Sequence, residues 1–245
     1  MYQVIRDDSI LAISTNRSDG VSKAPYDSLN LAYHVLDNKD DVDTNYSLLA
    51  NKLNIDVNDI YIPNQTHSKI MLEVKKNQTK ITNECDALYT KDKGVYIGVL
   101  TADCLPILMY AHDKEVVVAI HAGWQGSDKL IVQECISNLV ENENVDIQQL
   151  EIIFAPSIMA HNYEVQEDFK ENILKHQIED IDKCFLNKEN SLFFDNRLFN
   201  TLQLEQLGIS KKQITYIEEC TYEGNYFSYR QDKITGRQLS LIGIK

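Results

Sequence analysis

Three nearly continuous apolar runs in the middle of the chain give the clearest structural signal. They are Val95–Leu100, Leu105–Tyr110 and Val116–Ile120, and a short polar loop joins the last two. A strand with one face in water alternates apolar and polar residues, whereas a strand covered on both faces does not. We therefore predict three central strands that are buried on both faces.

The remaining pattern predicts further strands and helices on either side of this centre. Helical periodicity predicts helices over Asp43–Leu53, Leu130–Val140, Glu167–His176 and Asn196–Leu207. Short apolar runs predict strands over Ile10–Thr15, Leu150–Phe154, Ile214–Ile217 and Leu239–Ile244. Ser127 or Asp128 is the expected N-cap of the second helix, and Gly208 should end the fourth. Because no linker-like tract interrupts residues 1–245, we predict a single layered α/β or α+β domain.

Composition and charge exclude several classes of partner. The 245 residues carry a formal net charge of −13, which would repel a nucleic-acid backbone or an anionic membrane surface. No window has the roughly 18 consecutive apolar residues of a spanning helix, and the first residues do not resemble a secretory signal. The five cysteines include no Cys-x-x-Cys pair, so a disulfide framework is not expected. Together these features predict a cytoplasmic protein without membrane or nucleic-acid partners.

Three residues at the ends of apolar runs form a candidate metal-ligand set: His67, Cys104 and His121. Two imidazoles and one thiolate suit zinc, and three protein ligands leave the fourth tetrahedral position open for water or substrate. Each residue also has an ordinary structural interpretation. A cysteine is commonly a small buried hydrophobe, and a single histidine is commonly a hydrogen-bonded structural group. Convergence of the three side chains would decide between these interpretations.

The neighbours of these residues favour a site. Asp103 precedes the cysteine and is a candidate to orient a ligand, as metal-bound imidazoles usually require. Gly123 and Gly126 flank Trp124 in a turn, where the backbone must approach another group closely. The helix that follows this turn would favour an anion at its N-terminus. The remaining histidines, which we interpret as structural, are His34, His112, His161 and His176.

The motifs around these residues resemble those of the laccase-domain family. They are Gln65-Thr66-His67, Thr101-Ala102-Asp103-Cys104-Leu105-Pro106 and His121-Ala122-Gly123-Trp124-Gln125-Gly126. Further landmarks follow in order: Gly20-Val21-Ser22, Ser28-Leu29-Asn30-Leu31, Ala155-Pro156-Ser157-Ile158, Tyr163-Glu164-Val165, Phe227-Ser228-Tyr229-Arg230 and Thr235-Gly236-Arg237. Bacterial members of this family have been called multicopper polyphenol oxidases, peptidoglycan-editing factors and purine nucleoside phosphorylases. The resemblance covers nearly the whole chain.

The resemblance implies a fold, a metal and a reaction. The fold is a single domain of layered mixed sheets flanked by helices, similar to that of cysteine-dependent hydrolases. The metal is zinc, held by His67, Cys104 and His121, with copper as a possible substitute. The reaction is phosphorolysis of adenosine and inosine to free base and ribose 1-phosphate, with methylthioadenosine cleavage and adenosine deamination attributed to the same site. The chain departs from the family at Gln125 and Gln231, where arginine is usual, and at Ala155, where glycine is usual.

Phosphorolysis needs a phosphate clamp, a base-binding surface and groups that move protons. Arg230 and Arg237 are the candidates for the clamp because a guanidinium binds two phosphate oxygens at once; a structural ion pair is the alternative. Trp124 and Tyr163 are candidates to stack on a purine, although we favour burial in the core for each. Asn30 and Gln125 are further candidate substrate contacts, and a turn cap is the favoured role of Asn30. For deamination, the candidate proton shuttles are Asp103 and Glu164.

Three rival functions remain open at this stage. A copper oxidase is disfavoured because six histidines are few for a laccase's copper cluster. A second rival has Cys104 as thiolate nucleophile and His121 as base, acting on peptidoglycan precursors. The third is a non-catalytic zinc protein, which would need a fourth protein ligand; Cys220 and Cys85 are the candidates.

Overall fold

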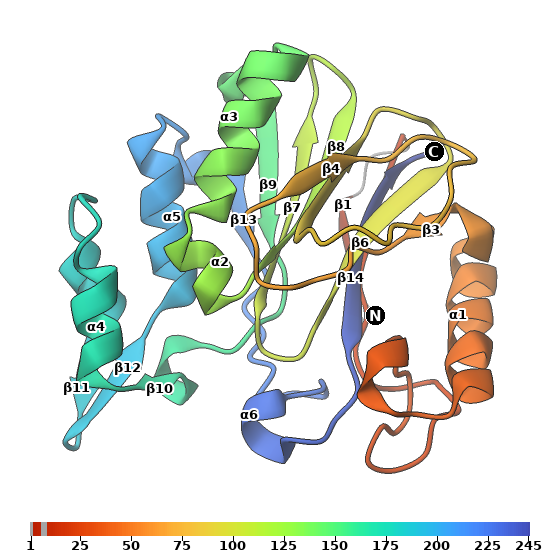
Figure 1. Cartoon of the computed structure of the whole chain (residues 1–245), viewed down its shortest axis with the longest axis horizontal. Helices are drawn as coiled ribbons and strands as arrows, with labels where there is room; N and C mark the ends of the chain where they lie inside the picture. The colour runs from red at the N-terminus through yellow and green to blue at the C-terminus, as the bar shows by residue number, and fades with distance from the viewer. Residues whose placement is uncertain (1, 6–8) are drawn as a thin grey trace.

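The computed structural model describes residues 2–5 and 9–245, and its centre is a pair of large β-sheets (Figure 1). The five-stranded sheet has the order β1 (Tyr2–Ile5), β2 (Ile10–Ser14), β14 (Gln238–Ile244), β6 (Val95–Thr101) and β3 (Ile60–Tyr61). The six-stranded sheet has the order β13 (Ile214–Tyr216), β9 (Leu150–Phe154), β7 (Leu105–Ala111), β8 (Val116–Ala122), β5 (Ala87–Thr90) and β4 (Met71–Glu73). A small third sheet contains β10 (Glu164–Val165), β12 (Ser191–Phe194) and β11 (Phe185–Lys188).

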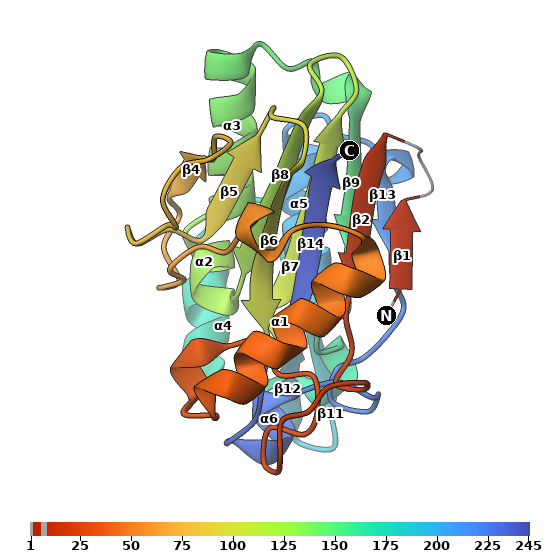
Figure 2. The ribbon, with the colours of Figure 1, turned by 90° about the vertical axis from the view of Figure 1, so that its right-hand side faces the viewer.

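Helices flank the sheets on several sides. They are α1 (Lys39–Leu53), α2 (Trp124–Asp128), α3 (Ile131–Glu143), α4 (Glu167–Ile173), α5 (Asn196–Gln206) and α6 (Tyr229–Asp232). Helix α1 lies against the five-stranded sheet, and α3 and α5 lie against the six-stranded sheet (Figures 1 and 2). The expected mixed α/β architecture of layered sheets flanked by helices is confirmed.

The two-sided burial predicted for the central strands is confirmed by the packing of β7. Every residue of β7 is buried. Ile107 and Met109 pack in the cluster that includes the apolar face of α3, whereas Leu108 and Tyr110 pack in the cluster between the two large sheets. Successive side chains of a strand point to opposite faces, so a strand with apolar layers on both sides must be apolar throughout.

Most predicted elements are present, but several boundaries differ. Helix α1 begins at Lys39 rather than Asp43, because the Asn38 side chain accepts hydrogen bonds from the N–H groups of Asp40 and Asp41 and caps the helix there. Helix α4 ends at Ile173 rather than His176. The fourth predicted helix, α5, ends at Gln206, and Gly208 follows with a φ of +87°, as expected for a helix stop.

The predicted N-cap of the second helix, Ser127 or Asp128, is wrong. Both residues belong to the separate short helix α2. The chain then turns at Leu130, which has a φ of 61°, and α3 begins at Ile131 without a side-chain cap. The apolar stripe begins at Leu130, so the predicted start of this helix is within one residue of the observed one, but the polar residues before it gave no sign of the short helix α2.

The fold brings three connections to one end of the paired sheets. The β6–β7 connection crosses from the five-stranded to the six-stranded sheet and contains Cys104. His121 is the penultimate residue of β8, and the β3–β4 loop supplies His67. Within the part of the chain that the structure describes, no helix is long and apolar enough to cross a membrane.

Candidate metal centre

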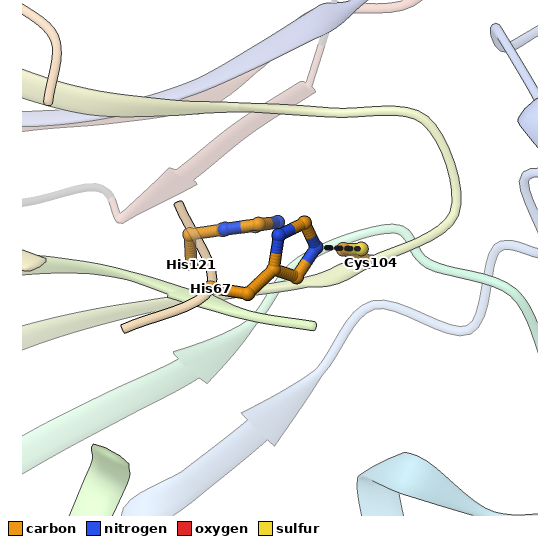
Figure 3. Close-up of side chains that lie close together, drawn as sticks. All are labelled: His67, Cys104 and His121. Carbon is orange, nitrogen blue, oxygen red and sulfur yellow. Dashed lines mark hydrogen bonds between the residues drawn. The ribbon is translucent and has the colours of Figure 1, made fainter. Parts of the chain in front are cut away.

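His67, Cys104 and His121 converge at this end of the sheets. Their donor atoms all lie within 4.8 Å of one another, and Cys104 Sγ is 4.0 Å from His67 Nε2 (Figure 3). The two imidazole rings meet edge to face with centroids 4.8 Å apart. Neither Cys85 nor Cys220 belongs to the group, so these residues do not supply the fourth ligand of a closed structural site. The donor chemistry fits zinc with one coordination position left open.

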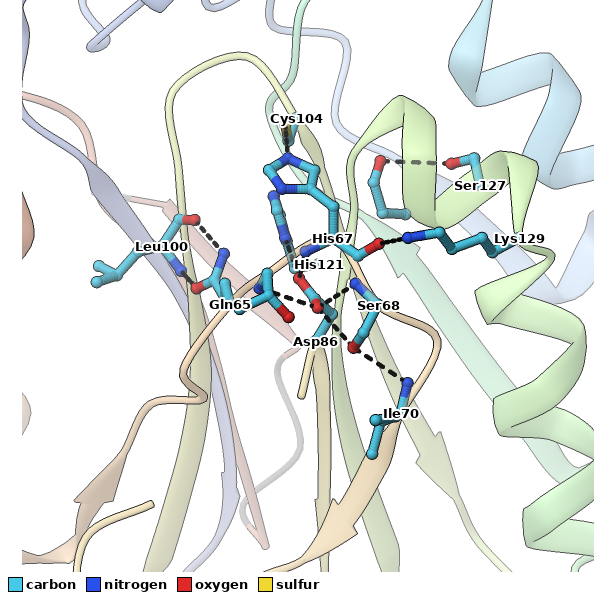
Figure 4. Close-up of polar contacts among 12 residues, drawn as sticks. Gln65, His67, Ser68, Ile70, Asp86, Leu100, Cys104, His121, Ser127 and Lys129 are labelled. Carbon is cyan, nitrogen blue, oxygen red and sulfur yellow. Dashed lines mark hydrogen bonds and ion pairs between the residues drawn. The ribbon is translucent and has the colours of Figure 1, made fainter. Parts of the chain in front are cut away.

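Asp86 organises two of the three ligands from behind (Figure 4). Its side chain is fully buried, and its Oδ1 lies 2.8 Å from His121 Nδ1. This contact leaves Nε2 of His121 as the donor that faces the site. The same carboxylate accepts hydrogen bonds from the backbone N–H groups of Thr66, His67 and Ser68, and from the Ser68 hydroxyl.

The site favours charged forms of its buried groups. Burial alone would raise the pKa of Asp86, but hydrogen bonds from His121 and Ser68 outweigh it and hold the pKa at about 2. Burial also opposes ionisation of the Cys104 thiol, yet the charge of His121 and hydrogen bonds from both imidazoles lower its pKa. Burial tends to lower the pKa of His121, but the Cys104 thiolate and Asp86 raise it. A thiolate is the form that binds a metal and the form that acts as a nucleophile.

The loop that carries His67 is held in a strained conformation. His67 has a φ of 58°, in the left-handed region that non-glycine residues rarely adopt. Its N–H donates to Asp86, and its carbonyl accepts a hydrogen bond from Lys129 Nζ. Gln65 anchors the same loop to β6, because its side-chain amide bonds both the carbonyl and the N–H of Leu100, each at 2.8 Å. Strain of this kind persists where surrounding contacts fix the backbone.

Gly123 leaves room for the ligands. A Cβ at this position would lie 2.7 Å from His67 Cδ2 and 3.0 Å from Cys104 Sγ. The φ of Gly123 is −65°, so alanine would fit the backbone and the obstacle is purely the neighbouring side chains. The close approach predicted for this turn is therefore explained by the side chains of His67 and Cys104.

Gly123→Ala should weaken metal binding by about tenfold or more, because the added methyl displaces His67 from Cys104. The measurement is a competition titration of zinc against a chromophoric chelator. Gly126→Ala is the matched control, since a Cβ there meets its nearest atoms only at 3.5 Å. Equal zinc affinities of the two variants would contradict this account of Gly123.

Asp103 does not orient a metal ligand, contrary to the role expected for it. Its carboxylate accepts hydrogen bonds from the Thr221 hydroxyl at 2.8 Å and from the N–H of Arg230 at 2.6 Å. Its carbonyl accepts a hydrogen bond from the N–H of Ile158. With a φ of 96°, Asp103 instead fixes the tight turn that presents Cys104. The orienting role belongs to Asp86, which the sequence analysis missed.

A cavity of about 1610 Å³ opens beside the ligands. All three ligands line it, as do Asp103, Trp124, Tyr163, Arg230 and Arg237 from the sequence analysis. Other cationic and aromatic residues in its wall are His34, Lys80, Lys233, Tyr33, Tyr46, Phe169 and Tyr229. A concave site with aromatic walls and a few charged groups is the usual form of a small-molecule site.

The two arginines predicted as a phosphate clamp both reach this cavity. Arg230 lies over the Tyr163 ring, with 5.2 Å from guanidinium carbon to ring centroid, and donates from Nη1 to the Glu164 carbonyl. Arg237 donates from Nη1 to the carbonyls of Thr235 and Gly236. Ion pairs elsewhere in the described chain involve other arginines, Arg17 and Arg197. The alternative role, a structural ion pair, is thus not what the structure gives Arg230 and Arg237.

Trp124 and Tyr163, for which we favoured burial in the core, both line the cavity. Trp124 is 38% exposed and lines the cavity, so its expected burial in the core is wrong. It contacts Phe169 edge to face, with ring centroids 5.3 Å apart. Tyr163 is only partly buried. It contacts Phe194 edge to face, and the Arg230 guanidinium lies over its ring.

Asn30 and Gln125 do not contact the cavity. Asn30 is fully buried, and its side chain bonds Ala32, Asp37 and the N–H of Arg237. The structure therefore gives Asn30 the favoured role in a structural turn, which positions Arg237, and not the substrate contact. Gln125 is exposed on α2 and is not part of the cavity wall. The expected departure from the family pattern at Gln125 therefore lies on a surface outside the cavity wall.

Comparisons with known proteins now place this site in a family. Residues 11–245 match the family model described as multi-copper polyphenol oxidoreductase laccase. The chain belongs to this family. Purine nucleoside phosphorylase YfiH of Escherichia coli is 32% identical over 235 residues, which cover 95% of this chain and 93% of that protein. Purine nucleoside phosphorylase YlmD of Bacillus subtilis is 28% identical, and the match covers 96% of this chain and 89% of that protein.

Solved structures of the family have the same fold. The crystal structure of YlmD from Geobacillus stearothermophilus aligns with a TM-score of 0.92 at 26% identity, over 97% of this chain and 93% of that one. The structure of a hypothetical protein YfiH from Bacillus licheniformis gives a TM-score of 0.91 at 28% identity, over 96% and 93% of the two chains. The resemblance inferred from the motifs is confirmed, and the relatives' names support an enzyme at the level of the family.

Proposed function

We propose that this chain is a zinc-dependent purine nucleoside phosphorylase that converts adenosine or inosine, with phosphate, to the free base and ribose 1-phosphate. The observation that carries the proposal is the three-donor group of His67, Cys104 and His121 in the wall of a cavity. Arg230 and Arg237 lie in the same wall, and neither forms an ion pair with any residue that the structure describes. Relatives named purine nucleoside phosphorylases support the choice of reaction. Zinc, when bound, supplies a Lewis acid at this wall.

The chain's own residues can hold both substrates. Arg230 and Arg237 present guanidinium groups that match the oxygens of phosphate, and they offset locally the chain's negative net charge. Trp124 offers a partly exposed ring to a purine. The Arg230 guanidinium lies over the Tyr163 ring, so we assign Tyr163 to holding Arg230 and not to stacking on the purine. Methylthioadenosine belongs to the same proposal, since the same type of glycosidic bond is cleaved.

Adenosine deamination is the weaker extension of the proposal. It requires a group that moves protons next to the purine, and Asp103 and Glu164 were the candidates. The Asp103 carboxylate is engaged by Thr221 and the Arg230 N–H, and the exposed Glu164 side chain accepts a hydrogen bond from Ser191. Asp103 is thus committed to its turn, and Glu164 does not line the cavity. We therefore expect phosphorolysis to predominate over deamination.

One experiment tests the reaction. Purified protein is incubated with adenosine, with and without inorganic phosphate, and the products are separated by chromatography. The proposal predicts adenine and ribose 1-phosphate only when phosphate is present. Inosine as the main product would establish a deaminase instead. Adenosine that stays unchanged, together with inosine that stays unchanged in a parallel incubation, would refute the proposal.

Arg230→Ala should raise the KM for phosphate by about ten- to a hundredfold, because charge-assisted hydrogen bonds are worth roughly 1.5–3 kcal/mol. The KM for adenosine should change much less. Steady-state kinetics at varied phosphate and fixed adenosine measure the effect. Arg230→Lys is the matched variant: it keeps the charge but loses the planar fork, so its KM should lie between the other two. An unchanged phosphate dependence would remove Arg230 from the clamp.

A second candidate function has its own supporting observation. The lowered pKa of the Cys104 thiol and the raised pKa of His121 describe a thiolate–imidazolium pair, which also suits a nucleophilic hydrolase acting on peptidoglycan precursors. Chelation separates the two candidates. Activity that survives complete removal of zinc but is lost on thiol alkylation favours the nucleophile, whereas activity that is lost with the metal and returns with it favours the phosphorylase.

A further inference from the structure

A second group of potential metal ligands lies outside the cavity. His161, Cys220 and Glu223 have donor atoms within 4.8 Å of one another, and none of the three lines the cavity. His161 and Glu223 are exposed, whereas Cys220 is buried beneath them. Among the described residues, this group and the candidate metal centre are the two that bring three such donors together.

Two hydrogen-bond donors hold the sulfur of Cys220 in place. Its Sγ accepts hydrogen bonds from the N–H of Met159 and from Asn162 Nδ2, both at 3.4 Å. Hydrogen bonds of this kind fix the position of a metal-ligating side chain. Asn162 Nδ2 also lies 2.7 Å from Glu223 Oε1, which in turn is 2.9 Å from His161 Nε2. One amide therefore aligns the sulfur and the carboxylate.

We propose that His161, Cys220 and Glu223 form a second metal site that binds a zinc-type divalent cation. A thiolate and an imidazole select borderline-soft cations such as Zn²⁺ over Mg²⁺ or Ca²⁺, which prefer oxygen ligands. Because the imidazole and the carboxylate are at the surface, the cation enters from solvent and reaches the buried sulfur without passing through the cavity. Three protein ligands leave one position for water.

The second site is attached to the turn that presents Cys104. Thr221, next to Cys220, donates its hydroxyl to the Asp103 carboxylate, and the N–H of Ile158 donates to the Asp103 carbonyl. A cation at the second site would tie residues 159–162 to residues 220–223, and so brace both of these supports of Asp103. We therefore assign it a structural role behind the cavity, independent of which reaction the cavity performs.

A surface ion pair between His161 and Glu223 is the competing explanation, and the chain offers a matched example of one. His112 Nε2 lies 3.3 Å from Glu151 Oε2 on the surface, and this pair is not part of any three-donor group. If a histidine–carboxylate pair alone explained the arrangement, both pairs would behave alike toward metal. The two pairs differ in the Cys220 thiol, which lies beside His161 and Glu223.

The test is a titration of chelator-stripped protein with Co²⁺, which reports thiolate coordination through its charge-transfer absorption, followed by Zn²⁺ displacement. Wild-type protein should bind two equivalents. The double variant His161→Ala with Glu223→Gln should lose one equivalent, and Cys104→Ala should lose the other. The control variant His112→Ala with Glu151→Gln should keep both. Cys220→Ser should remove the second site's charge-transfer band.

Two outcomes would overturn the proposal. One is wild-type protein that binds no metal at the second site, so that Cys104→Ala alone abolishes all binding. The other is a second equivalent that survives the double substitution of His161 and Glu223. If Cys220→Ser does not fold, the exposed His161 and Glu223 variants still decide the result. Failure of the proposed cavity site gives a different result from failure of the second site. If only the cavity site fails to bind metal, the one bound equivalent is lost in the Glu223 variant and kept in Cys104→Ala.

Discussion

Replacing Cys104 with alanine should abolish both zinc binding at the cavity and nucleoside phosphorolysis while the fold remains intact. The side chain is one of only three donors in the group, and its loss leaves two imidazoles that cannot hold zinc tightly. Removing a Lewis acid worth several kcal/mol in the transition state lowers the rate by about a thousandfold or more. Metal analysis and the adenosine assay measure the two losses, and circular dichroism checks the fold.

Comparison with Cys104→Asp separates a ligand from a nucleophile. Aspartate offers zinc an oxygen donor but cannot form a thioester or thioether, so a metalloenzyme should regain part of its zinc and its activity. His67→Ala and His121→Ala should resemble Cys104→Ala, whereas His112→Ala, which removes an imidazole far from the group, should resemble wild type. An alanine variant that keeps full zinc and full rate would exclude that residue from the site.

The fold could be predicted best where burial dictates the sequence. Strands β6, β7 and β8 are covered on both faces, so their positions are apolar throughout and easy to recognise. The short strands β4 and β10 and the small third sheet carry no comparable run and were missed. The short helix α2 was missed as well, because its five residues are too few to show an apolar period.

The candidate site could be predicted in its donors but not in its supports. His67, Cys104 and His121 stand at the ends of apolar runs, and their motifs matched a known family pattern. Asp86 carried a weaker cue, a single acid directly before the buried strand β5. Its partners come from the β3–β4 loop and from β8, so its role depends on contacts distant in sequence. Asp103 was chosen for this role because it is next to Cys104 in the sequence, but its carboxylate contacts Thr221 and Arg230.

Asp86→Asn should destabilise the zinc-free protein by about 3 kcal/mol and weaken zinc binding by about ten- to a hundredfold. Asp86 Oδ1 and Oδ2 together accept hydrogen bonds from three backbone N–H groups, the Ser68 hydroxyl and His121. An amide keeps one acceptor and turns an NH₂ group toward donors that then stay unpaired. Urea unfolding of stripped protein and chelator competition measure the two effects separately.

Asp128→Asn is the matched control for this loss. Asp128 also accepts from a histidine, His176, at 2.9 Å and from Asn172, but it is partly exposed and holds no metal ligand. Its substitution should leave zinc affinity unchanged and cost less stability, because water can replace the missing partner. Ser68→Ala, which removes only one of the donors to Asp86, should fall between them. Wild-type zinc affinity in Asp86→Asn would show that the ligands keep their geometry without the carboxylate, and that the strained His67 loop is held by Gln65 and Lys129 alone.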